Sequence, residues 1–290
     1  MAQQWFRVEI DSGQAPEPLL DSQIVFHGVN KSGSLCMANV LRESYLQHGR
    51  MDQFLSLYHN PATNLEEYRE SVNSSSGHAF FVGHYLYGAV DAPKKDRVIV
   101  SQFRHPVPRM ISCFQWLKNK HEKRHGDASG FPDLEKFIRK GKGKAHSQLK
   151  QFGAGFGPNS TELGKLSCQD LLERSQANIE QDVLLVGIAE EFEETLFMLA
   201  HMCGLPAVSP WRQDTRNKGR PLVSELPTSI TDLIADVYQH DVVLYQWAKR
   251  RFDAAVAAAD IGGDLEAYKL ACATQYKERV GDEAWQAIAL

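Results

Sequence analysis

Residues 24–49 read IVFHG, VNKSGS and LCMANVLRESYLQHG in succession, and each of the three parts has its own pattern. The first part is a short apolar run, which is typical of a buried strand. The third part repeats apolar residues at helical spacing from Cys36 to Tyr45, and Gly49 is a suitable helix end. The middle part is a loop of small and polar residues. We therefore expect a strand, a phosphate-sized loop and a helix.

The same alternation continues along the chain. Further strands are expected at 79–85, 97–103 and 182–187, and helices at 106–118, 134–139, 190–203 and 230–252, with loops over the rest of 126–158. Strands that alternate with helices imply right-handed βαβ units. We expect an α/β fold in which a central parallel sheet of about four or five strands is flanked by helices.

The expected organisation is one domain with two flanking segments. Residues 1–20 are turn-rich and form an N-terminal lead-in, residues 21–253 form the domain, and residues 254–290 form a helical C-terminal extension. The extension contains two Ala-rich amphipathic stretches separated by IGGD, which would suit packing against a second subunit. A homo-oligomer is therefore an open alternative.

Composition excludes several classes of protein. The 290 residues include 43% apolar and 23% charged residues, a globular balance that argues against a disordered chain or a disulfide miniprotein. The five cysteines are odd in number and form no CxxC pair, which indicates a reduced, cytoplasmic protein without a zinc ribbon. No run approaches the roughly 18 apolar residues of a membrane span, and the N-terminus does not resemble a signal peptide.

The charge is unevenly distributed. The net charge is −4, yet residues 94–150 contain 15 lysines and arginines against 5 acidic residues. Such a segment is either a solvated face or a region that receives an anion. A nucleic-acid partner is not expected, because the chain as a whole is acidic and contains no recognisable binding module.

The loop at residues 28–34 is the first candidate site. Its small residues allow backbone N–H groups to converge on a phosphate beside a helix N-terminus, with Lys31 as a mobile charge and Ser32 and Ser34 as hydroxyl donors. It is not a Walker A loop, since Lys31 precedes Gly33. The alternative is a polar turn with an incidental lysine.

The segment RHPVPRMIS at residues 104–112 is the second candidate site. Arg104 follows an expected strand, where its side chain can contact a second phosphate through two hydrogen bonds. Ser112 lies two turns into the expected helix and can point back along the same face. The alternative is that Arg104 and Arg109 form surface ion pairs.

Four segments in this order resemble one family. The strand–NKSGS–helix unit, GHYLYG, VSQFRHPVPRMISCF and LLVGIAEEFEETL, over about residues 24 to 250, are similar to sulfotransferases that use 3′-phosphoadenosine-5′-phosphosulfate (PAPS). The closest branch includes the carbohydrate 2-O-sulfotransferases. The resemblance implies a P-loop-like fold, with PAPS as co-substrate. It assigns binding of the phosphosulfate to Lys31, Ser32, Gly33 and Ser34, and binding of the 3′-phosphate to Arg104 and Ser112. The family also closes a late basic loop over the nucleotide, and the resemblance assigns that role to Arg216, Lys218 and Arg220.

The chain departs from the family pattern at three positions. Asn30 replaces a proline, Leu35 replaces a hydroxyl residue and His105 replaces an acidic residue. None of the three changes removes a required positive charge.

A general base is also implied, because an acceptor hydroxyl must lose its proton as its bond to sulfur forms. The related carbohydrate enzymes use a GH motif at a strand end, which His84 matches in FFVGHYLYG. His27 and His78 are the fallback candidates, and the alternative for a lone strand histidine is a core residue. Lys31 can stabilise the leaving oxygen, so no metal is required in principle.

One competing motif has to be weighed. His121, Glu122 and His125 match HExxH, the zinc motif of many metalloproteases. A zinc-binding helix of this type is normally buried, whereas KNKHEKRHGD is charged on every side and lacks a clear third ligand. A solvated helix end that lines an anionic substrate groove is the favoured interpretation.

The sequence therefore predicts a PAPS-dependent sulfotransferase that acts on a hydroxyl acceptor. A sugar is the first candidate acceptor, and a lipid, a polyketide or another small alcohol stays open. The alternatives are a nucleotide-dependent phosphotransferase, disfavoured by the lack of a Walker A loop and of an acidic Mg²⁺ ligand after a strand, and a non-catalytic nucleotide-binding module. The presence of Lys31, His84 and Arg104 together argues against the last.

Overall fold

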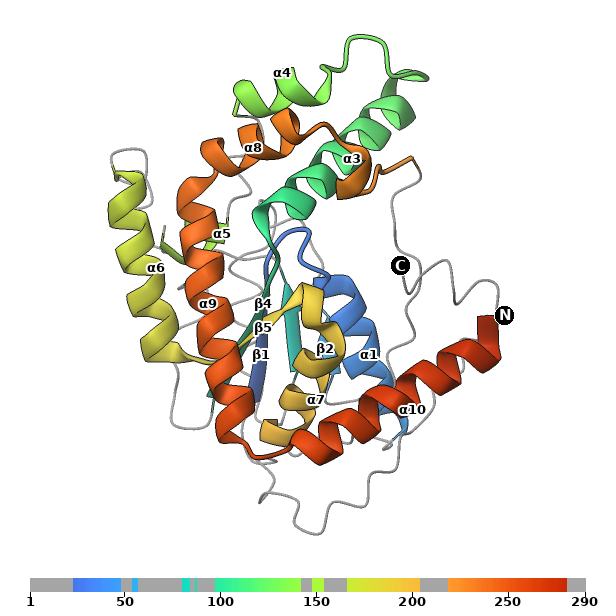
Figure 1. The fold of residues 1–290 in the computed structure, drawn as a ribbon, viewed down its shortest axis with the longest axis vertical. Coiled ribbons are helices and arrows are strands. Elements are labelled where there is room, and N and C mark those ends of the chain that lie inside the picture. Colours follow the sequence, from blue (N-terminus) through green and yellow to red (C-terminus); the bar gives the residue numbers. More distant parts are fainter. Residues whose placement is uncertain are drawn as a thin grey trace.

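The structure is a computed structural model that describes residues 23–47, 54–56, 80–83, 87, 97–141, 148–153, 166–203 and 219–280. Helices make up most of these residues, and they flank a parallel sheet (Figure 1). The sheet has the strand order β2-β3-β1-β4-β5. Its strands are β1 (Gln23–Gly28), β2 (Phe54–Ser56), β3 (Phe80–Gly83), β4 (Arg97–Phe103) and β5 (Val183–Ile188).

Every pair of neighbouring strands in this sheet is parallel. The expectation of an α/β fold with a parallel sheet flanked by helices is therefore confirmed. β1 is central: the chain moves from it toward β2 on one side, and from β4 toward β5 on the other. The carboxyl ends of β1 and β4 therefore form a switch point, which is where ligands bind in open α/β sheets.

The helices cover both faces of the sheet. Figure 1 shows α6 and α9 on one side and α1 and α7 on the other, and α7 and α9 both contact β5. The helices are α1 (Ser34–Gln47), α3 (Pro106–His125), α4 (Leu134–Arg139), α5 (Gln148–Gly153), α6 (Cys168–Asp182), α7 (Phe192–Cys203), α8 (Thr228–Val237), α9 (Gln239–Ala258) and α10 (Gly262–Val280), with short 3₁₀ turns η4 (Ala189–Glu191) and η5 (Val223–Glu225).

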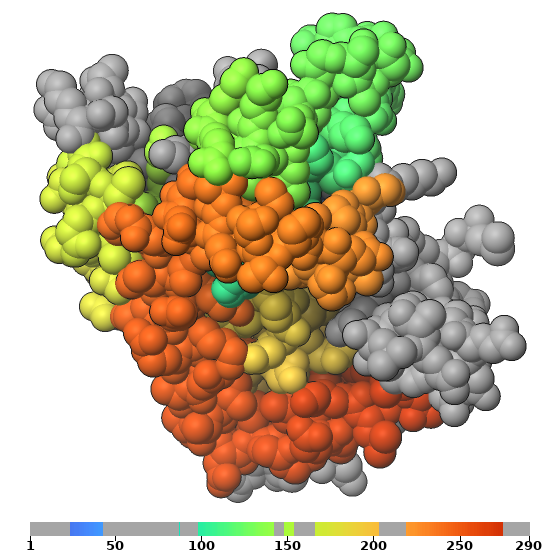
Figure 2. Space-filling model, turned by 45° about the horizontal axis from the view of Figure 1, so that its top comes forward, coloured from blue at the N-terminus to red at the C-terminus, as the bar shows by residue number. Residues whose placement is uncertain are grey.

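Two apolar clusters hold these layers together. The larger one joins the strands to the helices on both faces, and it includes Phe26 of β1, Leu244 of α9 and Tyr268 of α10. The smaller one joins α3, α4 and α8 through side chains such as Phe137 and Ile234. In Figure 1 this helical layer lies beyond the carboxyl end of β4, where the chain continues into α3. The space-filling view shows α7 at the floor of a hollow bordered by α8, α9 and α10 (Figure 2).

Several predicted elements are confirmed, because short-range patterns specify them. β4 and α4 have the predicted bounds, and Pro106 opens α3 as predicted. Pro106 occupies the first helical position, where proline loses no backbone hydrogen bond. The strand predicted at 182–187 begins one residue later, because Asp182 still belongs to α6.

Two helix predictions are wrong. The region 126–158 was expected to contain only the helix at 134–139, but it also contains α5, whose Gln148 and Leu149 amides donate to the Asp241 carboxylate at 2.7 and 3.2 Å. The single helix expected at 230–252 is two helices, α8 and α9, separated at Tyr238 (φ −112°, ψ 28°). The break lets α8 pack on α3 and α4 while α9 packs on β5 and α6.

The described part of the C-terminal region, through α10, packs into the domain core. α9 runs through residue 253, and α10 places Leu265, Tyr268 and Cys272 in the larger apolar cluster. The short strand β2 was not expected from the sequence, because three residues show no periodicity.

Candidate anion-binding site

The loop between β1 and α1 is a tight, internally bonded turn. The buried Ser32 and Ser34 hydroxyls both donate to the Val29 carbonyl oxygen, at 2.8 and 2.9 Å, and lie 3.1 Å from each other. Lys31 has φ 67° and Gly33 has φ 86°, so the backbone turns through the left-handed region twice. The two serine hydroxyls therefore stabilise the turn by hydrogen bonds to the backbone of the loop itself.

Gly33 also has a steric role. A Cβ atom on this residue would lie 3.3 Å from Nε2 of Gln102, and its φ of +86° favours glycine. Gln102 pairs with Gly28 at the carboxyl ends of β4 and β1, so its buried amide lies under the loop. Neither amide atom of Gln102 has a hydrogen-bond partner among the described residues.

Arg104 lies next to this loop because β1 and β4 are neighbouring strands. Its Nη1 atom donates to the Lys31 carbonyl oxygen at 3.3 Å. Burial, and then the nearby charge of Arg220, lower the pKa of Arg104 to about 10. Burial also lowers the pKa of Lys31, and the charges of Arg104 and Arg220 lower it further. Lys31, Arg104 and Arg220 therefore lie close enough for their charges to interact, and such a cationic region favours a bound anion.

The missed helix α5 holds both segments of this region. The Gln148 side-chain oxygen accepts the Arg104 backbone N–H at 2.9 Å, and the Gln151 side-chain oxygen accepts the Asn30 backbone N–H at 3.1 Å. Asp241 of α9 in turn binds the first amides of α5. α5 thereby fixes the loop and the end of β4 relative to each other.

The start of α3 is capped by His105. Its Nδ1 atom accepts the Val107 backbone N–H at 3.3 Å, which requires that Nδ1 carry no proton. Burial lowers the pKa of His105, which favours this neutral form, although the Glu190 charge opposes the shift. Further along α3, Ser112 and Arg109 are buried.

Trp116 of α3 lies beside Lys31. The Lys31 and Lys120 ammonium groups lie 5.6 and 5.3 Å from the indole centroid, within the range of cation–π attraction. The indole is 38% exposed, so this edge of the region presents an aromatic surface to solvent. The sequence patterns did not predict Trp116 as a site residue.

Some of the predicted site residues lie in the described part of the chain and others do not; Ser112 is described and is buried in α3. The structure places Lys31, Ser32, Gly33 and Ser34 in the loop, with Arg104 and Arg220 close to Lys31. His84, His78, Arg216 and Lys218 lie outside the described residues. Sequence reasoning missed five residues whose hydrogen bonds join segments distant in sequence: Gln148, Gln151, Glu190, Asp241 and Tyr245. It also missed Gln102, whose buried amide lies under the loop.

His27 lies at the end of β1 in a core-like position. It is 7% exposed, and its ring lies 4.5 Å from that of Phe152. Its carbonyl oxygen accepts the Ser101 hydroxyl at 2.7 Å. This packing matches the core alternative for a strand histidine.

The HExxH segment lies near the C-terminal end of α3. The His121 and His125 rings lie 4.4 Å apart, and Nε2 of His121 donates to the Ser129 carbonyl oxygen at 2.9 Å. Across the described ranges, no group of three or more histidine, cysteine, aspartate or glutamate side chains is arranged to hold a metal ion.

Within those ranges, no helix is both long and apolar enough to traverse a bilayer.

Comparison with models of known protein families finds no match for this chain, and a search of curated proteins finds none either.

Proposed function

We propose that this chain transfers a sulfuryl group from PAPS to a hydroxyl acceptor and releases adenosine 3′,5′-bisphosphate (PAP). The observation that carries the proposal is the convergence of Lys31, Arg104 and Arg220 at the carboxyl ends of β1 and β4. PAPS carries two separate anionic groups, and the loop and the end of β4 supply two adjacent cationic segments. The strand order, with the loop on central β1, supports a P-loop-like fold.

The proposed reaction is an in-line displacement at sulfur. The acceptor oxygen forms a bond to sulfur, the bond from sulfur to the 5′-phosphate oxygen breaks, and PAP departs with the electron pair. The acceptor proton passes to a base, for which the sequence predicts His84. In this proposal Lys31 stabilises the negative charge on the leaving oxygen.

The test compares nucleotides by thermal shift and calorimetry. PAP at 100 times its Kd should stabilise the fold by about 2.7 kcal/mol, and AMP, which lacks the 3′-phosphate, should bind more weakly. Arg104→Ala should reduce PAP binding by about 1.5–3 kcal/mol, the scale of a hydrogen bond to a charged group. Transfer of labelled sulfate from PAPS to a panel of sugar, lipid and small-alcohol acceptors then identifies the substrate class.

Two results would contradict the proposal. Stabilisation by ATP with Mg²⁺ but not by PAP would favour the phosphotransferase alternative. Tight PAP binding without sulfate transfer to any acceptor of the panel would favour the non-catalytic nucleotide-binding module.

A further inference from the structure

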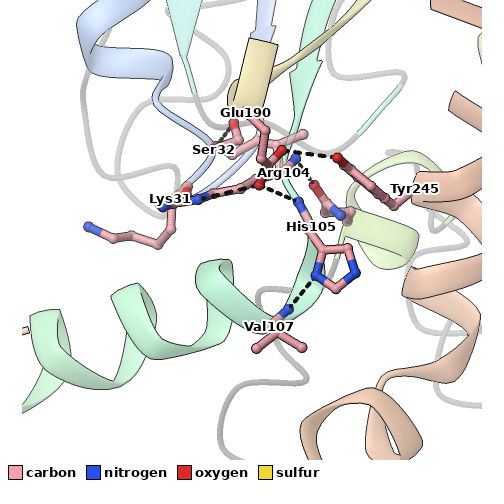
Figure 3. A network of polar contacts seen from close by, with 9 residues as sticks. Lys31, Ser32, Arg104, His105, Val107, Glu190 and Tyr245 are labelled. Carbon is pink, nitrogen blue, oxygen red and sulfur yellow. Dashed lines mark hydrogen bonds and ion pairs between the residues drawn. The ribbon is translucent and has the colours of Figure 1, made fainter. Parts of the chain in front are cut away.

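Glu190 connects three residues at the edge of the cationic region. It belongs to η4, directly after β5, and Figure 3 shows its carboxylate among Arg104, His105 and Tyr245. Oε1 accepts the His105 backbone N–H at 3.0 Å and lies 3.9 Å from Nε of Arg104. Oε2 accepts the Tyr245 hydroxyl at 3.1 Å. Both carboxylate oxygens are thus held by donors other than the guanidinium.

This arrangement constrains the Arg104 side chain from two directions. Nη1 donates to the Lys31 carbonyl oxygen at 3.3 Å, while Nε faces the anchored Glu190 carboxylate. Neither contact uses Nη2. An arginine that is hydrogen-bonded at Nη1 and faces an anchored carboxylate at Nε loses less conformational freedom when Nη2 binds an anion, so its binding is stronger.

The contact between Arg104 and Glu190 is too long to act as a strong ion pair, and the carboxylate is about one-third exposed. The fixed direction of the carboxylate is therefore the feature that matters. Tyr245 supplies that direction from α9, and its ring also meets the His105 ring edge-on, with centroids 5.1 Å apart.

We infer that Glu190, held by Tyr245, is a positioning residue that orients Arg104 toward the 3′-phosphate of the nucleotide. The inference rests on the proposed function, since it assigns a ligand to Arg104. It adds an acidic residue and a tyrosine that the sequence did not mark as parts of the site.

Glu191 offers a matched control on the same turn. Its Oε1 lies 2.8 Å from Nζ of Lys249, so Glu191, like Glu190, contacts a side chain of α9. Its ion pair is with Lys249 and not with Arg104. Glu191→Gln therefore removes a neighbouring charge of the same sign at a similar exposure. It separates a local charge effect from an effect on Arg104.

The experiment measures Kd for PAP and AMP by calorimetry in the full chain, in Glu190→Gln, Tyr245→Phe and Glu191→Gln, and in Arg104→Ala with and without Glu190→Gln. Glu190→Gln and Tyr245→Phe should weaken PAP by about 3- to 10-fold and leave AMP unchanged. Glu191→Gln should change neither. In the Arg104→Ala background, Glu190→Gln should cause no further loss, because the two residues act through one contact.

Four outcomes would overturn the inference. Equal weakening of PAP and AMP binding would indicate a general structural effect. If Glu190→Gln weakened PAP binding as much in the Arg104→Ala background as in the full chain, Glu190 would act independently of Arg104. Wild-type-like PAP binding by both Glu190→Gln and Tyr245→Phe would remove the role while leaving the proposed function intact. Failure of the unsubstituted chain to prefer PAP to AMP would overturn both proposals.

Discussion

The Arg104 guanidinium donates to the carbonyl oxygen of Lys31 at 3.3 Å, although the two residues are 73 positions apart in the chain. The contact joins the segment after β4 to the loop after β1 and brings two cations together. Lys31 adopts a left-handed conformation, φ 67°, which turns its carbonyl toward Arg104. The geometry of the loop and the position of the second cation are therefore coupled.

Lys31→Ala should weaken PAP binding by about 1.5–3 kcal/mol, because it removes a cation from the phosphosulfate loop. It should also lower kcat, since Lys31 is proposed to stabilise the leaving oxygen. The backbone strain at φ 67° is similar for alanine and lysine, so folding stability should change little. Calorimetry and steady-state kinetics measure the two effects. Lys120→Ala is the control, because Lys120 also lies over Trp116 but belongs to α3; an equal effect there would contradict the assignment.

His84→Ala should lower kcat by about 10²–10⁴-fold while PAP affinity stays unchanged, because a general base acts on the acceptor and not on the nucleotide. His27→Ala should instead lower the free energy of unfolding, since the His27 ring packs on Phe152. Kinetics and urea denaturation of both variants separate the roles. Full turnover by His84→Ala, together with a loss of turnover by a folded His27→Ala, would indicate that His27 is the general base.

His105 should make stability depend on pH. Burial lowers its pKa from the ordinary value of 6.5, so the unfolded chain takes up the proton more readily as pH falls. The stabilisation by neutral His105 is complete above about pH 6.5 and is lost as pH falls through the lower folded-state pKa. Urea denaturation between pH 5 and 8 measures this dependence.

Two variants isolate the contribution of the cap. His105→Asn keeps a cap acceptor for the Val107 amide but does not titrate, so the pH dependence should be reduced. His105→Ala should cost about 1 kcal/mol at pH 7.5, because the cap is lost. A pH dependence unchanged in His105→Asn would show that another group causes it.

Gln102→Met should raise the free energy of unfolding by about 1–2 kcal/mol. Within the described ranges, both amide atoms of Gln102 are buried without a partner, and an unsatisfied buried polar group is costly. Gln148→Met is the matched control, and it should destabilise because it removes the acceptor of the Arg104 backbone N–H. Urea denaturation measures both. Destabilisation by Gln102→Met would show that the amide makes a favourable contact.

Chelation by EDTA should leave sulfate transfer unchanged, because Lys31 and the loop amides are proposed to carry the charge of the leaving group. The measurement is turnover before and after EDTA, with Zn²⁺ added back. A loss of turnover that Zn²⁺ restores, and that His121→Ala prevents Zn²⁺ from restoring, would instead support a metal site at the HExxH segment.

The local patterns were sufficient to predict the β1–loop–α1 unit, β4 and the start of α3. In each, the relevant physics spans a few residues: apolar runs form buried strands, helical spacing forms one apolar face, and proline suits the first helical turn. The adjacency of the loop and Arg104 also followed, because carboxyl ends of parallel strands share one edge.

Tertiary structure alone decided which residues hold these segments in place. Gln148 binds Arg104 across 44 positions, Glu190 binds His105 across 85, and Asp241 binds the amide of Gln148 across 93. No periodicity records such pairs, because each depends on strand register and on where a helix packs. α5 is the clearest case, because a buried carboxylate from the distant helix α9 binds its first two amides, and no local pattern in the sequence records that contact.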